Sequence, residues 1–210
     1  MVYVGGTFSN IGGQARVNLA AFDLAGNVNS WAPNANNSVS SIAVSSDGLT
    51  IYVGGSFSMI GAASQSRSNL AAIESSTGNA TAWNPGPDNF VLALAVSGST
   101  VYAGGAFANV GGQPRNNVAA LDAVTGIPTS WAPNPNLPVS SLAVSGSTVY
   151  IGGSFTSIGG QPRNRLAAVD SSSGAVSAWN PDVNNTVNSI IASGSAVFIG
   201  GSFSAVGGQT

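Results

Sequence analysis

One short motif recurs five times along the chain and constrains its fold more than any other feature. An aromatic residue, a small or aliphatic residue and two glycines begin at intervals of 48 to 50 residues, at Tyr3, Tyr52, Tyr102, Tyr150 and Phe198. A tryptophan and a proline two residues later keep the same phase, at Trp31, Trp83, Trp131 and Trp179 and at Pro33, Pro85, Pro133 and Pro181. Self-similarity at such a period is typical of solenoids and propellers, so the chain is an array of one repeated unit.

Each unit reads as four short β-strands, and the second unit shows the pattern well. Apolar and small polar residues alternate in its first strand, and a Ser-Asp-Gly turn follows. The predicted strands are 39–45, 49–57, 69–74 and 79–83. Pro85 ends the last one because proline cannot donate to a strand ladder. No segment sustains a 3.6-residue period, so we expect essentially no helix.

Four antiparallel strands in about 40–50 residues form one blade of a β-propeller. We therefore predict a single all-β domain over residues 1–210, a propeller of four-stranded antiparallel blades. Four blades is the first expectation. Part of a ring of five or more blades, or a ring completed by another molecule, is the alternative. The repeats are 1–38 (partial), 39–89, 90–138, 139–186 and 187–210 (partial), and each tryptophan is expected to plug the space between blades.

The two ends of the chain do not match a simple closed ring. The chain begins in the second strand of one unit and ends after the second strand of another. That is 17 predicted strands, whereas blades of four strands need 16 or 20. Either the ends pair within one chain, or open edges with unpaired N–H and C=O groups join another molecule. The residues expected at this closure are Val2, Tyr3, Val187, Ile190, Val197 and Phe198.

The repeat also carries a family resemblance. The pattern Tyr-Val-Gly-Gly-x-Phe-x-x-Ile-Gly-Gly-Gln-x-Arg-x-Asn-Leu-Ala-Ala-x-Asp, then Gly and Ser-Trp-x-Pro, resembles uncharacterised propeller repeats of bacterial surface proteins. It is similar to repeats of fungal cortical polarity-marker proteins and, more distantly, to kelch-type propellers. The resemblance covers the whole chain and implies a secreted or cell-surface setting, with no catalytic residues to transfer. Met1 leads directly into the first repeat, so no signal peptide is visible.

Composition excludes many functions. The chain has no histidine, cysteine or lysine, which removes imidazole and thiol chemistry, Schiff bases and zinc–thiolate sites. A net charge of −2 argues against nucleic-acid binding, and no apolar run is long enough for membrane insertion. The glycine pairs lack the lysine and helix of a phosphate loop, and each loop offers at most one carboxylate for calcium. We expect no cofactor and no metal.

The carboxylates are the remaining candidates for catalysis. Asp23, Glu74, Asp122 and Asp170 occupy one repeat position, at the end of the third strand, where a carboxylate accepts backbone N–H groups of a turn. Asp88 and Asp182 lie in equivalent loops, and a glycosidase would need such a pair. No general-acid partner is evident. An enzyme is thus the least favoured function, and we predict no catalytic residue.

The repeated arginines are candidate binding residues. Arg16, Arg67, Arg115 and Arg163 precede the acids by seven residues, about 23 Å along a strand, so arginine and acid should not pair. Each arginine should instead lie near Trp31, Trp83, Trp131 or Trp179. One interpretation is a stack or backbone clamp that holds the preceding loop. The other is a ring of pockets that binds a glycan or an acidic protein multivalently.

The best functional hypothesis is therefore a non-catalytic scaffold or binding module with an unknown protein or glycan ligand. The alternatives are a lectin-like propeller and a module that assembles with copies of itself by exchange of terminal strands. The second repeat departs from the others, with Ala62-Ala63-Ser64-Gln65-Ser66 in place of Gly-Gly-Gln, so any pocket there would differ.

Overall fold

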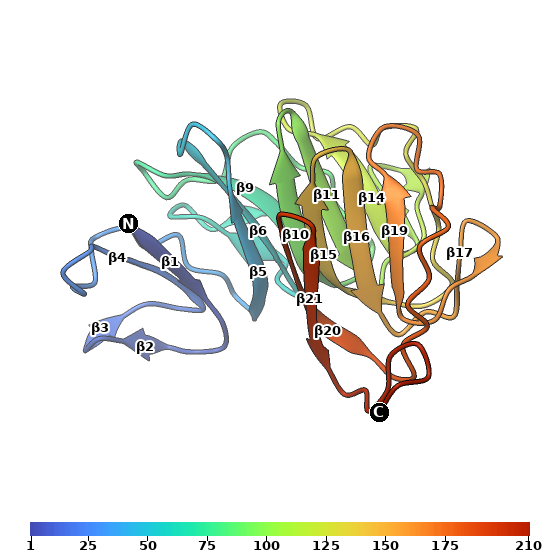
Figure 1. Ribbon diagram of the computed structural model, residues 1–210. Helices are drawn as coiled ribbons and strands as arrows, with labels where there is room; N and C mark the ends of the chain where they lie inside the picture. Colours follow the sequence, from blue (N-terminus) through green and yellow to red (C-terminus); the bar gives the residue numbers. More distant parts are fainter.

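The computed structural model describes residues 1–210, which form 21 strands and no helix. Five antiparallel sheets stand side by side in one curved row (Figure 1). Four small hairpins, each made of two strands of two residues, lie at the margins of these sheets. The predicted class, an all-β propeller of antiparallel blades, is confirmed. The structure contains no helix long and apolar enough to span a membrane.

The blades are built from three kinds of strand, which follow one another in each repeat. The first strands are β5 (Val39–Val44), β10 (Val91–Ser97), β15 (Val139–Ser145) and β20 (Val187–Ser193). The second strands are β1 (Val2–Gly5), β6 (Thr50–Gly55), β11 (Thr100–Gly105), β16 (Thr148–Gly153) and β21 (Ala196–Gly201). The third strands are β4 (Leu19–Phe22), β9 (Leu70–Glu74), β14 (Val118–Asp122) and β19 (Leu166–Asp170).

Three blades hold all three of these strands, in the orders β5-β6-β9, β10-β11-β14 and β15-β16-β19. Each has a bulge in its first strand, for example between Val91 and Ala93. The second glycine of the repeated motif, Gly105, lies opposite Val91 at this bulge. The two backbones approach so closely there that only glycine fits.

The fourth segment of each blade differs from the expected strand. Residues 79–83 make one bridge, Ala80 to Ile73, and the other repeats bridge once at the equivalent place. The ladder stops because the next carbonyl, that of Thr81, accepts a hydrogen bond from Arg67 instead of a strand partner. The chain then turns toward the neighbouring blade with its tryptophan.

The loop between second and third strands contains a small hairpin that the sequence pattern did not predict. These hairpins are β2–β3 (Asn10–Ile11, Gln14–Ala15), β7–β8 (Met59–Ile60, Gln65–Ser66), β12–β13 (Asn109–Val110, Gln113–Pro114) and β17–β18 (Ser157–Ile158, Gln161–Pro162). Gly111 and Gly112, at φ of 57° and 70°, make the turn of the third one. That left-handed conformation explains the glycine pair without any phosphate-binding role.

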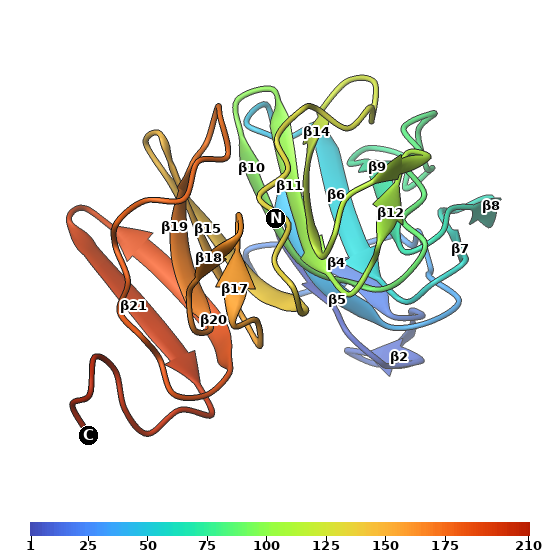
Figure 2. The same ribbon diagram turned by 90° about the vertical axis from the view of Figure 1, so that its right-hand side faces the viewer.

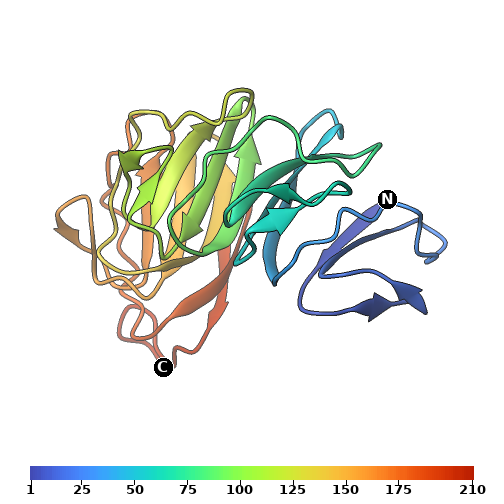
Figure 3. The same ribbon diagram turned by 180° about the vertical axis from the view of Figure 1, so that it is seen from behind.

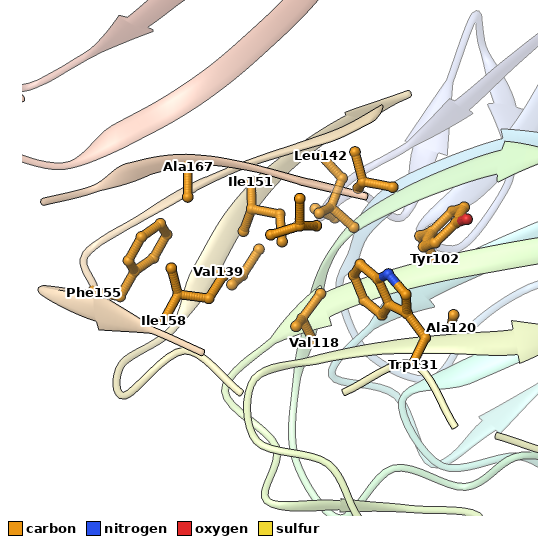
Figure 4. Packing of buried hydrophobic residues seen from close by; sticks show 13 residues of the cluster. Tyr102, Val118, Ala120, Trp131, Val139, Leu142, Ile151, Phe155, Ile158 and Ala167 are labelled. Atoms are coloured by element: carbon orange, nitrogen blue, oxygen red, sulfur yellow. The ribbon is translucent and has the colours of Figure 1, made fainter. Parts of the chain in front are cut away.

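The hydrophobic core lies between blades rather than within one sheet. Figure 4 shows Tyr102 and Trp131 of one blade facing Leu142, Ile151 and Ala167 of the next. Two similar clusters lie between the preceding blades. The expected filling of the space between sheets by aliphatic residues and tryptophan is therefore confirmed for the inner blades.

The two end blades are incomplete, and the expected closure within one chain is not formed. β1 pairs only with β4, and β20 pairs only with β21, so no ladder joins Val187 or Ile190 to Val2 or Tyr3. In Figures 1 and 3 the first blade lies at one edge of the molecule, away from β20 and β21, and in Figure 2 β20 and β21 lie at one edge with the first blade behind the inner blades. A ladder needs strands about 4.8 Å apart, which this separation prevents.

One position before the third strand has a left-handed backbone in every repeat. Asn18, Asn69 and Asn117 have φ of 62° to 63°, and Arg165 has φ of 62° in the last repeat. The asparagine side chains each donate to a carbonyl of the following loop, as Asn117 does to Pro135 at 2.9 Å. Arg165 makes no equivalent bond.

We expect the substitution Arg165→Asn to stabilise the protein by about 1 kcal/mol, because asparagine tolerates this conformation and restores one hydrogen bond. Urea unfolding followed by circular dichroism measures the change. The reciprocal substitution Asn117→Arg should destabilise. A loss of stability in Arg165→Asn would contradict this account.

Candidate functional site

The repeated arginines are backbone clamps. Each Nη2 atom donates to the carbonyl two residues before the tryptophan of its own blade, from Arg16 to Asn29, Arg67 to Thr81, Arg115 to Thr129 and Arg163 to Ser177. Each Nη1 atom donates to the carbonyl of the preceding residue at 2.7–2.8 Å. The guanidinium thus joins the end of the small hairpin to the fourth segment, which is the clamp interpretation.

The arginines are also poorly placed to bind a ligand. They are only partly exposed, and their Nε atoms are buried without a hydrogen-bond partner. In each case both Nη atoms already donate to main-chain carbonyls, for example to Pro114 and Thr129 from Arg115. The repeated acids accept hydrogen bonds from other groups, so no repeated arginine pairs with the acid of its repeat, as expected.

The tryptophans tie each blade to the next. Trp31, Trp83 and Trp131 are 5, 4 and 2% exposed. Their Nε1 atoms donate to the main-chain carbonyls of Glu74, Asp122 and Asp170 in the following blade, at 3.1, 2.9 and 2.9 Å. The glycine of the same turn lies close to the indole in each case, at Gly78, Gly126 and Gly174.

The aromatic residue of the repeated motif completes this contact. Tyr102 packs edge-on against Trp131 with ring centroids 5.2 Å apart, and the other three tyrosines do the same in their blades at 5.0–5.4 Å. The Tyr52 and Tyr102 hydroxyls donate to the carbonyls of Ala123 and Ser171, one residue after the acid of the next blade. Burial raises the pKa of both tyrosines.

Trp179 is the exception among the four tryptophans. It is 39% exposed, and its partner Tyr150 is half-buried. A hollow of about 490 Å³ lies over them, lined also by Thr148, Ala168 and Ser177. The equivalent groove at Trp83 is smaller, about 350 Å³, because Ala123 and Val124 of the next blade line it. The larger hollow is therefore the place that a following third strand and turn would occupy.

The repeated acids close the turns after the third strands, as predicted. The Asp122 carboxylate accepts the N–H groups of Val124 and Thr125, and Asp170 accepts those of Ser172 and Ser173. The Ser172 hydroxyl, with the Ser173 N–H and hydroxyl groups, holds the pKa of Asp170 well below its usual 3.8. The Thr125 N–H and hydroxyl likewise lower the pKa of Asp122. The Asn27 side chain lowers that of Asp23.

These shifts predict how stability depends on pH. A carboxyl whose pKa is lowered by folding stabilises the protein fully above the unfolded value of 3.8 and loses that contribution as pH falls through the folded value. The urea midpoint should therefore be flat from about pH 7 to pH 5 and fall below about pH 4. Asp170→Asn should weaken this fall. A midpoint unchanged down to about pH 3 would contradict the prediction.

Asp88 and Asp182, the acids in equivalent loops, also accept hydrogen bonds from nearby residues. Asp88 is exposed, and its Oδ1 accepts the N–H groups of Ala108 and Asn109 while Asn109 Nδ2 donates to Oδ2. Desolvation opposes ionisation of Asp88, but these bonds together lower its pKa. Asp182 accepts a bond from Asn164 Nδ2 at 2.7 Å. A general acid needs a raised pKa, so Asp88 is unsuited to that role.

Sequence reasoning missed the link between each tryptophan and the acid-bearing turn of the next blade. It placed the acids in turns and the tryptophans between blades as separate features. The signal was present, because Trp83 and Trp131 both precede the residues whose carbonyls they bind, Asp122 and Asp170, by 39 residues. That separation crosses a repeat boundary, so it identifies a contact between blades.

Repeated blades joined through a buried Tyr–Trp pair define this chain as a β-propeller repeat protein. Residues 148–170, which are β16, the hairpin and β19 of one blade, match the family described as "Domain of unknown function (DUF5122) beta-propeller". No curated protein sequence is significantly similar to the chain.

Solved structures with the same fold share little sequence with this chain. The computationally designed Ika4 protein is 15% identical, with a TM-score of 0.56, and the match covers 80% of this chain and 90% of that one. The RRP9 WD40 repeats are 13% identical, with a TM-score of 0.52 over 72% of this chain and 41% of that one. The structure of U3-55K is also 13% identical, with a TM-score of 0.51 over 72% and 42%. The chain thus spans about two fifths of the last two.

Proposed function

We propose that this chain is a non-catalytic scaffold or binding module of a secreted or cell-surface protein. The observation that carries the proposal is where the repeated polar side chains make their bonds. Arg115 binds carbonyls, Asp122 binds turn N–H groups and Trp131 binds the next blade. Groups that would otherwise react with or bind a small substrate instead hold a hairpin, a turn and the contact between two blades in place.

The composition and the fold both support this proposal. Without histidine, cysteine or lysine, a hydrolytic reaction would depend on carboxylates, and the carboxylates described above stabilise their own loops. Similarity to WD40 repeats supports the propeller scaffold at the level of fold alone. A secreted or surface setting rests on the resemblance of the repeat to bacterial surface proteins.

A panel of glycoside hydrolase substrates tests the absence of catalysis. We expect no turnover above buffer by the unmodified chain. Turnover that disappears in both Asp88→Asn and Asp182→Asn, but persists in Asp47→Asn, would overturn the proposal. Asp47 is the matched control because it closes an ordinary turn with Ser45 and Leu49.

The lectin-like alternative stays a prediction, and the structure narrows it. Three of the four tryptophans are covered by neighbouring blades, so only Trp179 offers an exposed indole face to a sugar. A glycan array with the unmodified chain and Trp179→Ala tests this. Sugar binding that is lost on the substitution would favour the alternative over a plain scaffold.

A further inference from the structure

The groove at Trp83 lies between two complete blades, β5-β6-β9 and β10-β11-β14, and both blades depart from the repeat beside it. Its volume is about 350 Å³. Most of its lining is apolar, and two threonines add hydroxyl groups. The lining residues are Thr50, Ala72, Thr81, Ala82, Trp83, Ala123 and Val124.

The turn that forms one wall of this groove is apolar where the turns after β9 and β19 are polar. After β14 it reads Ala123-Val124-Thr125-Gly126-Ile127, whereas the other two read Ser75-Ser76-Thr77-Gly78-Asn79 and Ser171-Ser172-Ser173-Gly174-Ala175. Val124 is 83% exposed and Ile127 is 60% exposed. Since polar turns fold in the same place in other blades, the fold does not require these apolar side chains.

The turn between β5 and β6 departs from the repeat as well. It reads Ser45-Ser46-Asp47-Gly48-Leu49-Thr50, whereas the equivalent turns Ser97-Gly98-Ser99-Thr100 and Ser145-Gly146-Ser147-Thr148 are shorter and carry no charge. The longer turn supplies a carboxylate, Asp47, and an apolar side chain, Leu49, which is 66% exposed. Its last residue lines the groove, so the departures in the two blades meet at one place.

Two carboxylates from different blades lie near the groove. The Tyr52 hydroxyl donates to the carbonyl of Ala123, in the wall of the groove. Burial raises the pKa of Tyr52, and the negative charges of Asp47 and Asp122 raise it further. The hydrogen bonds that Asp47 and Asp122 accept all go to Oδ1, so Oδ2 of each carboxylate is free to accept another.

This end of the strands carries carboxylates and no cationic side chain. In β14, Asp122 pairs with Thr100 at the turn end, whereas Val118 pairs with Gly104 at the hairpin end. The acids at the turn end are Asp23, Asp47, Glu74, Asp122 and Asp170. All five arginines lie at the hairpin end, namely Arg16, Arg67, Arg115, Arg163 and Arg165. The charge beside the groove is therefore complementary to a cation.

We propose that this groove binds a basic segment of a protein partner. The aliphatic stem of a lysine or arginine lies against the apolar lining, and its charged head lies between Asp47 and Asp122. Long cationic side chains bury their stems in this way while the head stays near water or a carboxylate. An apolar residue next to the cation packs on Leu49 or Val124, which gives both departures from the repeat one explanation. The inference rests on the proposed binding-module function and deepens it by naming the chemistry of the partner.

Titration of the full chain into short fluorescein-labelled peptides, followed by fluorescence anisotropy, tests the proposal. A peptide of alternating lysine and leucine should bind, one of alternating lysine and serine should bind more weakly, and one of alternating glutamate and leucine should not bind. Added salt should weaken the binding, because it screens exposed charges. In NMR spectra the amide signals of Thr50 and Val124 should shift, whereas that of Gly112 in a hairpin turn should not. If the lysine–leucine peptide does not bind at low salt, the proposal is wrong.

Two variants test the groove itself, Val124→Ser and Asp47→Asn. Serine is already present at the equivalent position, Ser172, and asparagine keeps the shape of the aspartate, so both variants should fold. Each should weaken binding of the lysine–leucine peptide by about tenfold, because one removes apolar contact and the other removes a charged acceptor. The matched controls Leu24→Ser and Asp170→Asn change the same kinds of side chain in other turns at this end, and should leave the affinity unchanged.

The controls separate a groove from general attraction to an acidic face. Equal weakening by Asp47→Asn and Asp170→Asn would show that the peptide follows the charge of the whole face, which would overturn the proposal. Unchanged affinity in both Val124→Ser and Asp47→Asn would overturn it as well. Circular dichroism shows whether each variant is folded. Neither result bears on the absence of catalysis, which the substrate panel tests separately.

Discussion

Replacing Trp131 with alanine should lower the free energy of unfolding by about 3–5 kcal/mol, the range for truncating a large buried aromatic side chain. Trp131 is 2% exposed and lies between two blades, against Tyr102 and the residues shown in Figure 4. Truncation leaves a cavity in that cluster and removes the bond to the Asp170 carbonyl. Urea unfolding followed by circular dichroism measures the loss.

Trp179→Ala is the matched comparison, because Trp179 has the same position in its repeat as Trp131 has in the preceding one. Trp179 is 39% exposed, and the following blade, β20–β21, has no third strand to cover it, so the loss should be well under half of that for Trp131 when both are measured as monomers. Equal losses would contradict the conclusion that tryptophan stabilises this protein through the blade that follows it.

Gly105→Ala is expected to destabilise by about 3 kcal/mol, the upper end of the range for overpacking. A Cβ at Gly105 would lie 2.0 Å from the Phe90 carbonyl oxygen and 3.1 Å from the Val91 Cα. Both neighbours are backbone atoms at a bulge, so no side-chain rotation relieves the contact. The substitution should separate β10 from β11 locally, and thermal unfolding measures the effect.

Gly6→Ala provides the control, since Gly6 is the same residue of the motif in the first repeat. No first strand lies beside β1, and a Cβ there would meet only Phe8, at 3.4 Å. Stability should change by no more than about 0.5 kcal/mol. A large loss in Gly6→Ala would mean that the glycine serves the motif itself rather than the close approach of the first strand.

Both comparisons express the same property of a repeat protein. Each blade contacts only its neighbours, so the energetic role of a residue depends on whether the neighbouring blade is present. The bonds from Tyr102 and Trp131 to the next blade lie within one chain, whereas Tyr150 and Trp179 have no such partner.

Several features followed from the sequence because their causes are local. The period of the motif predicted antiparallel blades that follow one another along the chain, and alternation of apolar residues predicted first strands such as β5. Asp122 was correctly placed in a turn, because an aspartate before Thr125 and Gly126 can accept nearby N–H groups. The clamp was one of two interpretations of Arg115, and its position near the tryptophan was correct.

Other features depended on contacts between residues distant in the sequence. The pattern of residues 79–83 predicts a strand, yet the Arg67 guanidinium takes the carbonyl that a ladder would use. An added Cβ would meet backbone atoms at Gly105 but only the Phe8 side chain at Gly6, because only Gly105 faces a first strand.

The repeats by themselves therefore determined the fold class of this protein, since strand period, turn residues and spacing act over a few residues. Only the tertiary structure decided which repeat residues are buried and whether the ends meet. Trp131 and Trp179 have the same place in their repeats, and one is covered while the other is exposed. The physical reason is that burial and ring closure depend on how successive blades are placed, which no single repeat encodes.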